Sequence, residues 1–135
     1  MILIIDTSTD QNQIAKAEKS GKIVKIISWQ GQRQSQLLLP KIDQLLKQSQ
    51  KNLKDLSGIL VFSGPGSFTG LRVGIAVANS LGFALEIPVV GISEKRLPQD
   101  WQLQDLSRIG FRKLPQKFRP ITPFYGQLPK TTCLH

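Results

Sequence analysis

The stretch GPGSFTGLRVGIAVANSLGFAL, residues 64–85, decides the fold class of this chain. It follows a short apolar run at residues 58–63 that is typical of a buried strand, and its glycine-rich turn leads into a helix predicted for residues 71–85. A strand, a tight turn and a helix in this order indicate an α/β domain with helices packed on a sheet.

The predicted helix at 71–85 has almost no polar face. Its polar side chains are Arg72, Asn79 and Ser80, and a helix that is apolar all round is usually buried on two sides. A strip of small residues allows another helix or sheet to come close. The strip consists of Gly70, Gly74, Ala78 and Gly82. It could seat the helix on its own sheet, but we expect it to meet a partner chain, so that Gly74→Leu would abolish pairing and leave a folded monomer.

The elements on either side of this helix complete a mixed five-stranded sheet in the order βββαβαβ. The first three strands are expected to form an antiparallel meander. A first helix is predicted from Gln36, with Ser35 as its N-cap and with Leu38, Ile42 and Leu45 along one face. The predicted strands are residues 2–5, 12–18, 23–29, 58–63 and 87–92.

The sequence changes character after Ser93. Residues 94–135 are basic and rich in proline, so we divide the chain into a domain at 1–93 and a short tail at 94–135. One short helix could form in this tail around Trp101, Leu103, Leu106 and Ile109.

Residue types exclude several functions. The only cysteine is Cys133 and the only histidine is His135, so an internal disulfide, a histidine general base and a histidine metal cluster are all unavailable. We therefore expect no catalytic residue, no metal and no cofactor. The short apolar start and the lack of an 18-residue apolar run predict a cytoplasmic protein that does not enter a membrane.

The net charge of +9 favours a polyanionic or acidic partner, although a merely soluble basic surface gives the same number. The glycine-rich loop of Gly64, Gly66, Ser67 and Thr69 lies before a helix and could bind an anion there. It lacks the Lys-Ser/Thr ending of a P-loop, and we interpret it as a structural turn in which Gly66 or Gly70 supplies a positive φ. Asp6 is interpreted as a loop carboxylate that caps nearby N–H groups.

Four segments together resemble the TsaB (YeaZ) family of tRNA threonylcarbamoyladenosine biosynthesis proteins. They occur in the order of that family. The segments are IDTS at 5–8, QLLLPKI at 36–42, GPGSFTGLRVG at 64–74 and IPVVGIS at 87–93. The resemblance implies an actin-like ATPase (ribonuclease H-like) fold, of which residues 1–93 are the first lobe.

The resemblance also implies a non-catalytic scaffold subunit that pairs with the enzyme TsaD through helices of this lobe. TsaE and tRNA are further expected members of the complex, and the chain alone could form a homodimer. The residues expected at the partner interface are Leu38, Ile42, Leu45, Gly70, Gly74, Ala78 and Gly82.

The chain departs from the family at three places. Gln34 and Gln36 flank Ser35 where the family often has His and Glu, and too few residues follow Ser93 for a second lobe. Residues 94–119 match no segment of the family, and 121–126 resemble its closing element only faintly. A naturally short member and a truncated, self-associating one both fit these departures. A small basic RNA-binding module is the alternative function.

Overall fold

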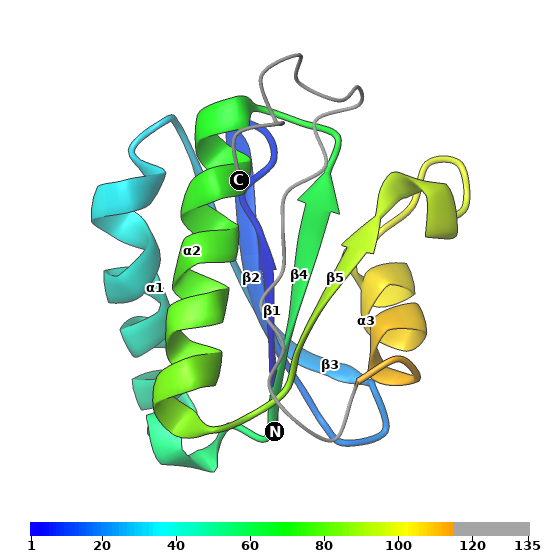
Figure 1. Cartoon of the computed structure of the whole chain (residues 1–135). Helices are drawn as coiled ribbons and strands as arrows, with labels where there is room; N and C mark the ends of the chain where they lie inside the picture. Colours follow the sequence, from blue (N-terminus) through cyan, green and yellow to red (C-terminus); the bar gives the residue numbers. More distant parts are fainter. Residues whose placement is uncertain (115–135) are drawn as a thin grey trace.

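Residues 1–114 are described by the computed structural model, and they form a sheet with helices on both of its faces (Figure 1). The sheet is mixed, five-stranded and ordered β3-β2-β1-β4-β5. The strands are β1 (Ile2–Asp6), β2 (Gln11–Ala17), β3 (Ile23–Gln30), β4 (Gly58–Gly64) and β5 (Val89–Ser93). The helices are α1 (Gln34–Gln48), α2 (Phe68–Leu85) and α3 (Leu103–Phe111), with short 3-10 turns at Leu53–Asp55 and Glu94–Arg96. The expected βββαβαβ order is confirmed, and α3 follows it.

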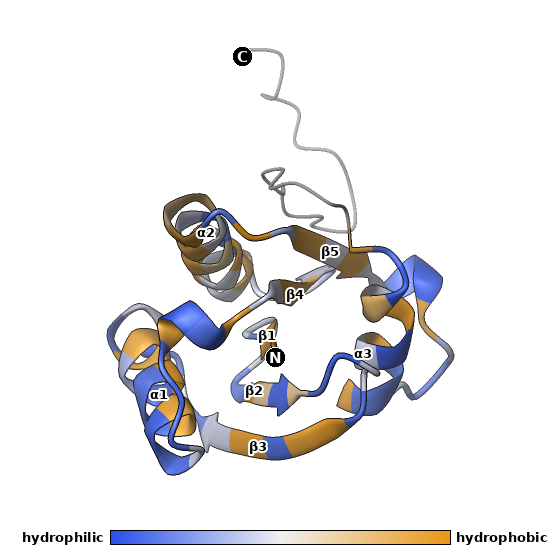
Figure 2. Cartoon of the chain, turned by 90° about the horizontal axis from the view of Figure 1, so that it is seen from below, coloured by the Kyte–Doolittle hydropathy of each residue, from blue (hydrophilic) through white to orange (hydrophobic). Residues whose placement is uncertain are grey.

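The chain direction of the strands follows from their connections. β1, β2 and β3 form the expected antiparallel meander, joined by short turns. β1, β4 and β5 run parallel because α1 and α2 carry the chain back across one face of the sheet. Figure 2, seen along the strands, shows α1 and α2 on one face and α3 on the other.

The central strands β1 and β4 are buried at every position and mostly apolar, because both of their faces are covered. Leu3 and Ile5 of β1 point into a core shared with α1 and α2, whereas Ile2 and Ile4 point into a second core under α3. Successive side chains of a strand alternate between its faces, so a strand between two helix layers needs apolar residues at every position.

The helices α1 and α2 each begin earlier than predicted. α1 starts at Gln34 with Arg33 as its N-cap, so Ser35 lies in the first turn and does not cap the helix. The Gln34 side chain is buried beside Gly70. α2 starts at Phe68, and its N-cap Ser67 accepts a hydrogen bond from the backbone N–H of Gly70 at 3.3 Å.

The segment after Ser93 is part of the fold and not a separate tail as far as Leu114. Leu103 and Leu106 of α3 are buried against the sheet, and Trp101 stacks on Phe62 with ring centroids 4.8 Å apart. The predicted short helix is confirmed, but the predicted boundary at residue 93 falls inside packed structure. The remainder of the predicted tail, 115–135, lies outside the described residues.

Two hydrogen bonds tie α3 to the turn between β2 and β3. The Gly21 carbonyl accepts from the Gln104 side chain at 2.9 Å and from the Ser107 hydroxyl at 2.5 Å. Segments more than 80 residues apart are thereby joined, so α3 closes the second core and also holds the hairpin.

We expect Leu106→Ala to lower the free energy of unfolding by about 2–5 kcal/mol, because the side chain is fully buried and its removal leaves a cavity. Urea unfolding followed by circular dichroism measures this value. Arg112→Ala, at the exposed end of the same helix, is the control and should stay within about 0.5 kcal/mol of the unchanged chain. Equal stability of the two variants would show that α3 is not part of the cooperative fold.

Candidate partner interface

One face of α2 is buried against its own chain. All seven residues predicted to contact a partner are buried inside the chain, three on α1 and four on α2. They are Leu38, Ile42, Leu45, Gly70, Gly74, Ala78 and Gly82. The prediction is corrected for these residues. The small-residue strip seats α2 on its own sheet, as the sequence also allowed, and the strip is not available to a partner.

The glycines are required because α2 approaches the end of β1 very closely. A Cβ at Gly70 would collide with the backbone carbonyl oxygen of Thr7, and a Cβ at Gly74 would collide with the Thr7 hydroxyl. That hydroxyl donates a 2.6 Å hydrogen bond to the Gly70 carbonyl. The contact therefore leaves no volume for a side chain at either glycine.

The opposite face of the same two helices is exposed and apolar. A shallow groove runs between α1 and α2, and Figure 2 shows hydrophobic positions along both helices. The residues that line the groove are Leu39, Ala76, Val77, Ser80, Leu81 and Ala84. Leu39 is 52% exposed, and on the same side of α2 Phe83 is 75% exposed. The groove is the candidate interface of this chain.

The predicted interface lay on α1 and α2, and the structure buries the faces of these helices that carry the predicted residues. Ala76, Ser80 and Ala84 recur every four residues on α2, as the glycines do, two positions out of step with them. This second stripe was the available signal. The glycines predicted a partner contact because small residues fit a close helix contact. In the structure that close contact is made within the chain.

By length and composition α2 is also the one helix among residues 1–114 that could cross a membrane. The expectation that no segment is long and apolar enough is therefore corrected. In this fold α2 is apolar because one face packs on the sheet and the opposite face lines the groove.

The glycine-rich loop is packed against the loop after β1. The Ser67 backbone N–H donates to the Ser8 carbonyl at 2.6 Å, and a Cβ at Gly66 would lie 2.6 Å from the Ser8 side chain. Gly64 has a φ of +120°, so the positive φ predicted for Gly66 or Gly70 is found at Gly64 instead. Thr69 is exposed on the first turn of α2. These contacts fit the structural interpretation of the loop.

Asp6 is buried at the carboxyl end of β1. One carboxylate oxygen accepts from the Ser8 backbone N–H at 3.0 Å and from the Ser8 hydroxyl at 2.6 Å, so Asp6 caps its own loop as predicted. Burial raises the pKa of Asp6 above its ordinary value of 3.8, and the two Ser8 hydrogen bonds oppose that rise in pKa. Among residues 1–114 no three His, Cys, Asp or Glu side chains form a group that could hold a metal ion.

Known proteins match about two thirds of this chain. The family model TsaD, described as tRNA N6-adenosine threonylcarbamoyltransferase, matches residues 13–96. A "tRNA threonylcarbamoyladenosine biosynthesis protein TsaB" of Buchnera aphidicola subsp. Schizaphis graminum is 38% identical over 94 residues, which are 69% of this chain and 44% of that protein. A "tRNA N6-adenosine threonylcarbamoyltransferase" of Nitrosospira multiformis is 47% identical over 55 residues, which are 41% of this chain and 16% of that protein.

A solved structure supports the same conclusion about the fold. YeaZ from Pseudomonas aeruginosa is 34% identical in sequence and superposes with a TM-score of 0.63, over 68% of this chain and 43% of that protein. The expected actin-like ATPase fold is thereby confirmed. The chain spans less than half the length of the TsaB proteins that it matches.

We expect Gly74→Leu to destabilise or unfold the monomer, contrary to the expectation from sequence, because the added side chain must displace Thr7. Overpacking of this kind costs about 1–3 kcal/mol or more. Ala76→Leu adds a leucine to the exposed face of the same helix and is the matched control. Urea unfolding of both variants measures the difference, and a Gly74→Leu chain as stable as the control would refute this account of the strip.

Asp6→Asn tests the buried carboxyl through pH. Because the pKa of Asp6 is raised in the folded chain, the folded state binds this proton more tightly than the unfolded state. The stability of the unchanged chain relative to Asp6→Asn should therefore fall as the pH rises from 3.8 through the folded-state pKa, and then become constant. Unfolding free energies between pH 3 and pH 7 measure it. Asp100→Asn removes an exposed carboxylate and is the control. If the stability of the unchanged chain relative to Asp6→Asn rose with pH, burial would not be what shifts the pKa of Asp6.

Proposed function

We propose that this chain is a non-catalytic subunit of the machinery that makes threonylcarbamoyladenosine on tRNA. The chain belongs to the family of the TsaD model and is a TsaB (YeaZ)-type member of it. Its role in this proposal is to bind a TsaD-type enzyme. The single observation that carries the proposal is the exposed apolar groove between α1 and α2.

The groove has the composition of a surface that a partner covers. Burying apolar area gives roughly 25 cal/mol per Å², and contiguous exposed apolar surface typically marks a protein interface. Leu39 lines the groove with a large aliphatic side chain that is half exposed. Three of the other lining residues are small, Ala76, Ser80 and Ala84, so another helix can lie close to the backbone of α2 along them.

The likeness to TsaD-type enzymes supports the choice of partner. A segment of 55 residues is 47% identical between this chain and the Nitrosospira multiformis enzyme. Two related chains can present related helix pairs to each other, and such surfaces pair around an approximate two-fold axis, as the copies of a symmetric dimer do. The helices α1 and α2 would then form one layer of a four-helix interface.

The loops at the end of β1 support a non-catalytic role. The Asp6 carboxylate is engaged by Ser8, and Ser67 and Gly66 pack directly on Ser8, so the loop after β1 occupies the space beside the turn into α2. A nucleotide phosphate at the start of α2 would have to separate these two loops. TsaE and tRNA are proposed to join through the assembled complex.

We expect Ala76→Glu to weaken binding of TsaD from the same organism by about 100-fold or more. Its carboxylate would be buried without a partner in the interface, which costs about 3–5 kcal/mol. The side chain is exposed in the free chain, so folding should be retained. Size-exclusion chromatography with light scattering identifies the complex, and calorimetric titration gives its affinity.

Gln30→Glu is the matched control, because it adds the same charge at an exposed position of β3, away from the groove. It should bind TsaD as the unchanged chain does. Equal affinity of Ala76→Glu and Gln30→Glu would exclude the groove as the interface. A homodimer that Ala76→Glu breaks, with no TsaD complex, would show that a second copy of this chain occupies the groove.

A further inference from the structure

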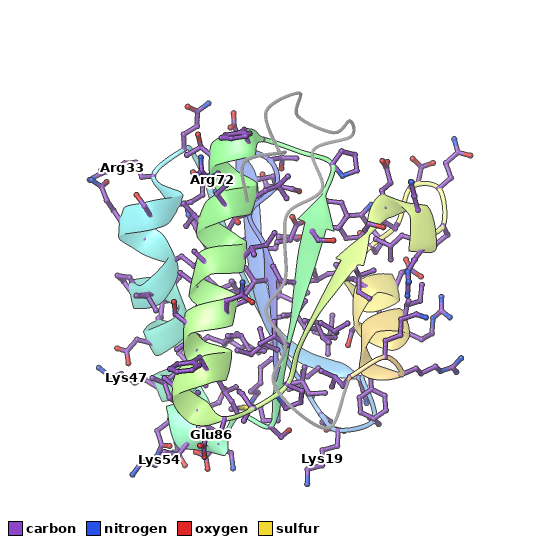
Figure 3. The ribbon with its side chains drawn as sticks, in the orientation of Figure 1. Lys19, Arg33, Lys47, Lys54, Arg72 and Glu86 are labelled. Carbon is purple, nitrogen blue, oxygen red and sulfur yellow. The ribbon has the colours of Figure 1, made fainter. Side chains whose placement is uncertain are left out.

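A second surface lies at the end of the domain where β1 begins and α1 ends. Two hollows meet there at Lys51, which lines both of them. One hollow is lined by Met1, Lys16, Ala17, Glu18, Lys19, Val24 and Lys51. The other is lined by Asp43, Leu46, Lys47, Lys51, Asn52, Leu53 and Lys54. Figure 3 shows Lys19, Lys47 and Lys54 at this end, with Arg33 and Arg72 at the other end of the domain.

This surface contains a pair of like charges on adjacent strands. Lys16 of β2 and Lys25 of β3 are direct partners in the antiparallel ladder, so their side chains leave the same face of the sheet side by side. Like charges at such positions oppose strand pairing. The pair lies on the face of α1, because Ile14, two residues before Lys16, belongs to the core under α1.

Four acidic side chains accompany the lysines at this end: Glu18 and Asp43 line the hollows, Asp55 follows the second hollow in the chain, and Glu86 lies at the same end of the domain (Figure 3). Asp43 forms an ion pair with Lys47 at 2.9 Å, and Asp55 accepts a 2.9 Å hydrogen bond from the Asn52 backbone N–H. Ion pairs among residues 1–114 include Lys47–Asp43 and Arg108–Asp105. Five further lysines belong to this surface: Lys16, Lys19 and Lys51 line the first hollow, Lys54 lines the second with Lys51, and Lys25 is the ladder partner of Lys16. We call these five residues the basic end.

We propose that the basic end binds the phosphate backbone of RNA. Cationic side chains spread over two adjoining hollows can contact successive phosphates, and a polyanion would relieve the repulsion between Lys16 and Lys25. Val24 and Leu53, which are 43% and 39% exposed, give each hollow an apolar wall. The choice of RNA over another polyanion rests on the proposed function, in which tRNA is the substrate of the complex.

The basic end and the groove do not share a residue. The groove lies between α1 and α2, whereas the basic end is built from β2, β3 and the segment after α1. One molecule can therefore hold an enzyme at the groove and leave the basic end open to RNA. This separation also allows the two bindings to be tested independently.

The test uses the full chain and a variant with Lys16→Gln, Lys25→Gln and Lys51→Gln. The matched control carries Arg96→Gln, Arg112→Gln and Lys113→Gln, three exposed cations on the side of α3. Both variants change the net charge from +9 to +6 (9 − 3 = 6). Fluorescence anisotropy of a labelled tRNA transcript, over a series of salt concentrations, gives the affinity and its dependence on salt.

We expect the unchanged chain and the control to bind tRNA alike at low salt. The Lys16, Lys25 and Lys51 variant should bind roughly tenfold more weakly or worse, and the slope of log affinity against log salt should fall by about 2–3, because three phosphate contacts are lost. Lys25→Gln alone should weaken tRNA binding and yet raise Tm at low salt, since it removes the repulsion from Lys16. Lysines retained only for folding would give the opposite change in Tm.

Equal weakening of both triple variants would overturn the proposal, since net charge alone would then explain it. Failure of the unchanged chain to bind tRNA at low salt would overturn it as well. Binding to phosphatidylserine vesicles without binding to tRNA would reassign the basic end to a membrane surface. TsaD binding by the same variants is measured separately, so a failure of the groove proposal and a failure at the basic end remain distinguishable.

Discussion

The contact between α2 and the end of β1 is the constraint on which the rest of this structure depends. Gly70 and Gly74 allow the helix to lie against Thr7 with no intervening side chain. The same approach brings the loop after β4 onto Ser8, so the turn into α2 and the turn after β1 are held by one set of contacts. A bulkier helix would separate these loops and move α2 away from the sheet.

This constraint also determines which surfaces the domain has to offer. The glycine face of α2 is turned toward the sheet, and apolar residues of its other side, among them Ala76, Val77 and Leu81, line the groove with Leu39 of α1. The second face of the sheet is closed by α3, which is held to the β2–β3 turn through Gly21. An apolar face without a cover in this chain therefore remains on the α1–α2 side, and a protein partner suits it.

Charge and hydrophobicity are separated in space on the described part of the chain. The apolar groove follows the two long helices, and the basic end gathers lysines from β2, β3 and the segment after α1. The loops around Asp6 and Ser67 satisfy each other's polar groups.

The sequence by itself determined the order of the elements, the mixed sheet and the family resemblance, because apolar runs, helical spacing and the GPGSFTG turn are local patterns. It also identified the two helices of the candidate interface. Tertiary structure alone decided which face of each helix is buried, since Gly74 and Ala76 differ little in character and only the position of Thr7 distinguishes them. It likewise decided that residues 94–114 pack as part of the domain, and that Lys16 lies beside Lys25 and shares a hollow with Lys51. These contacts join segments that are distant along the chain, so neither composition nor periodicity predicts them.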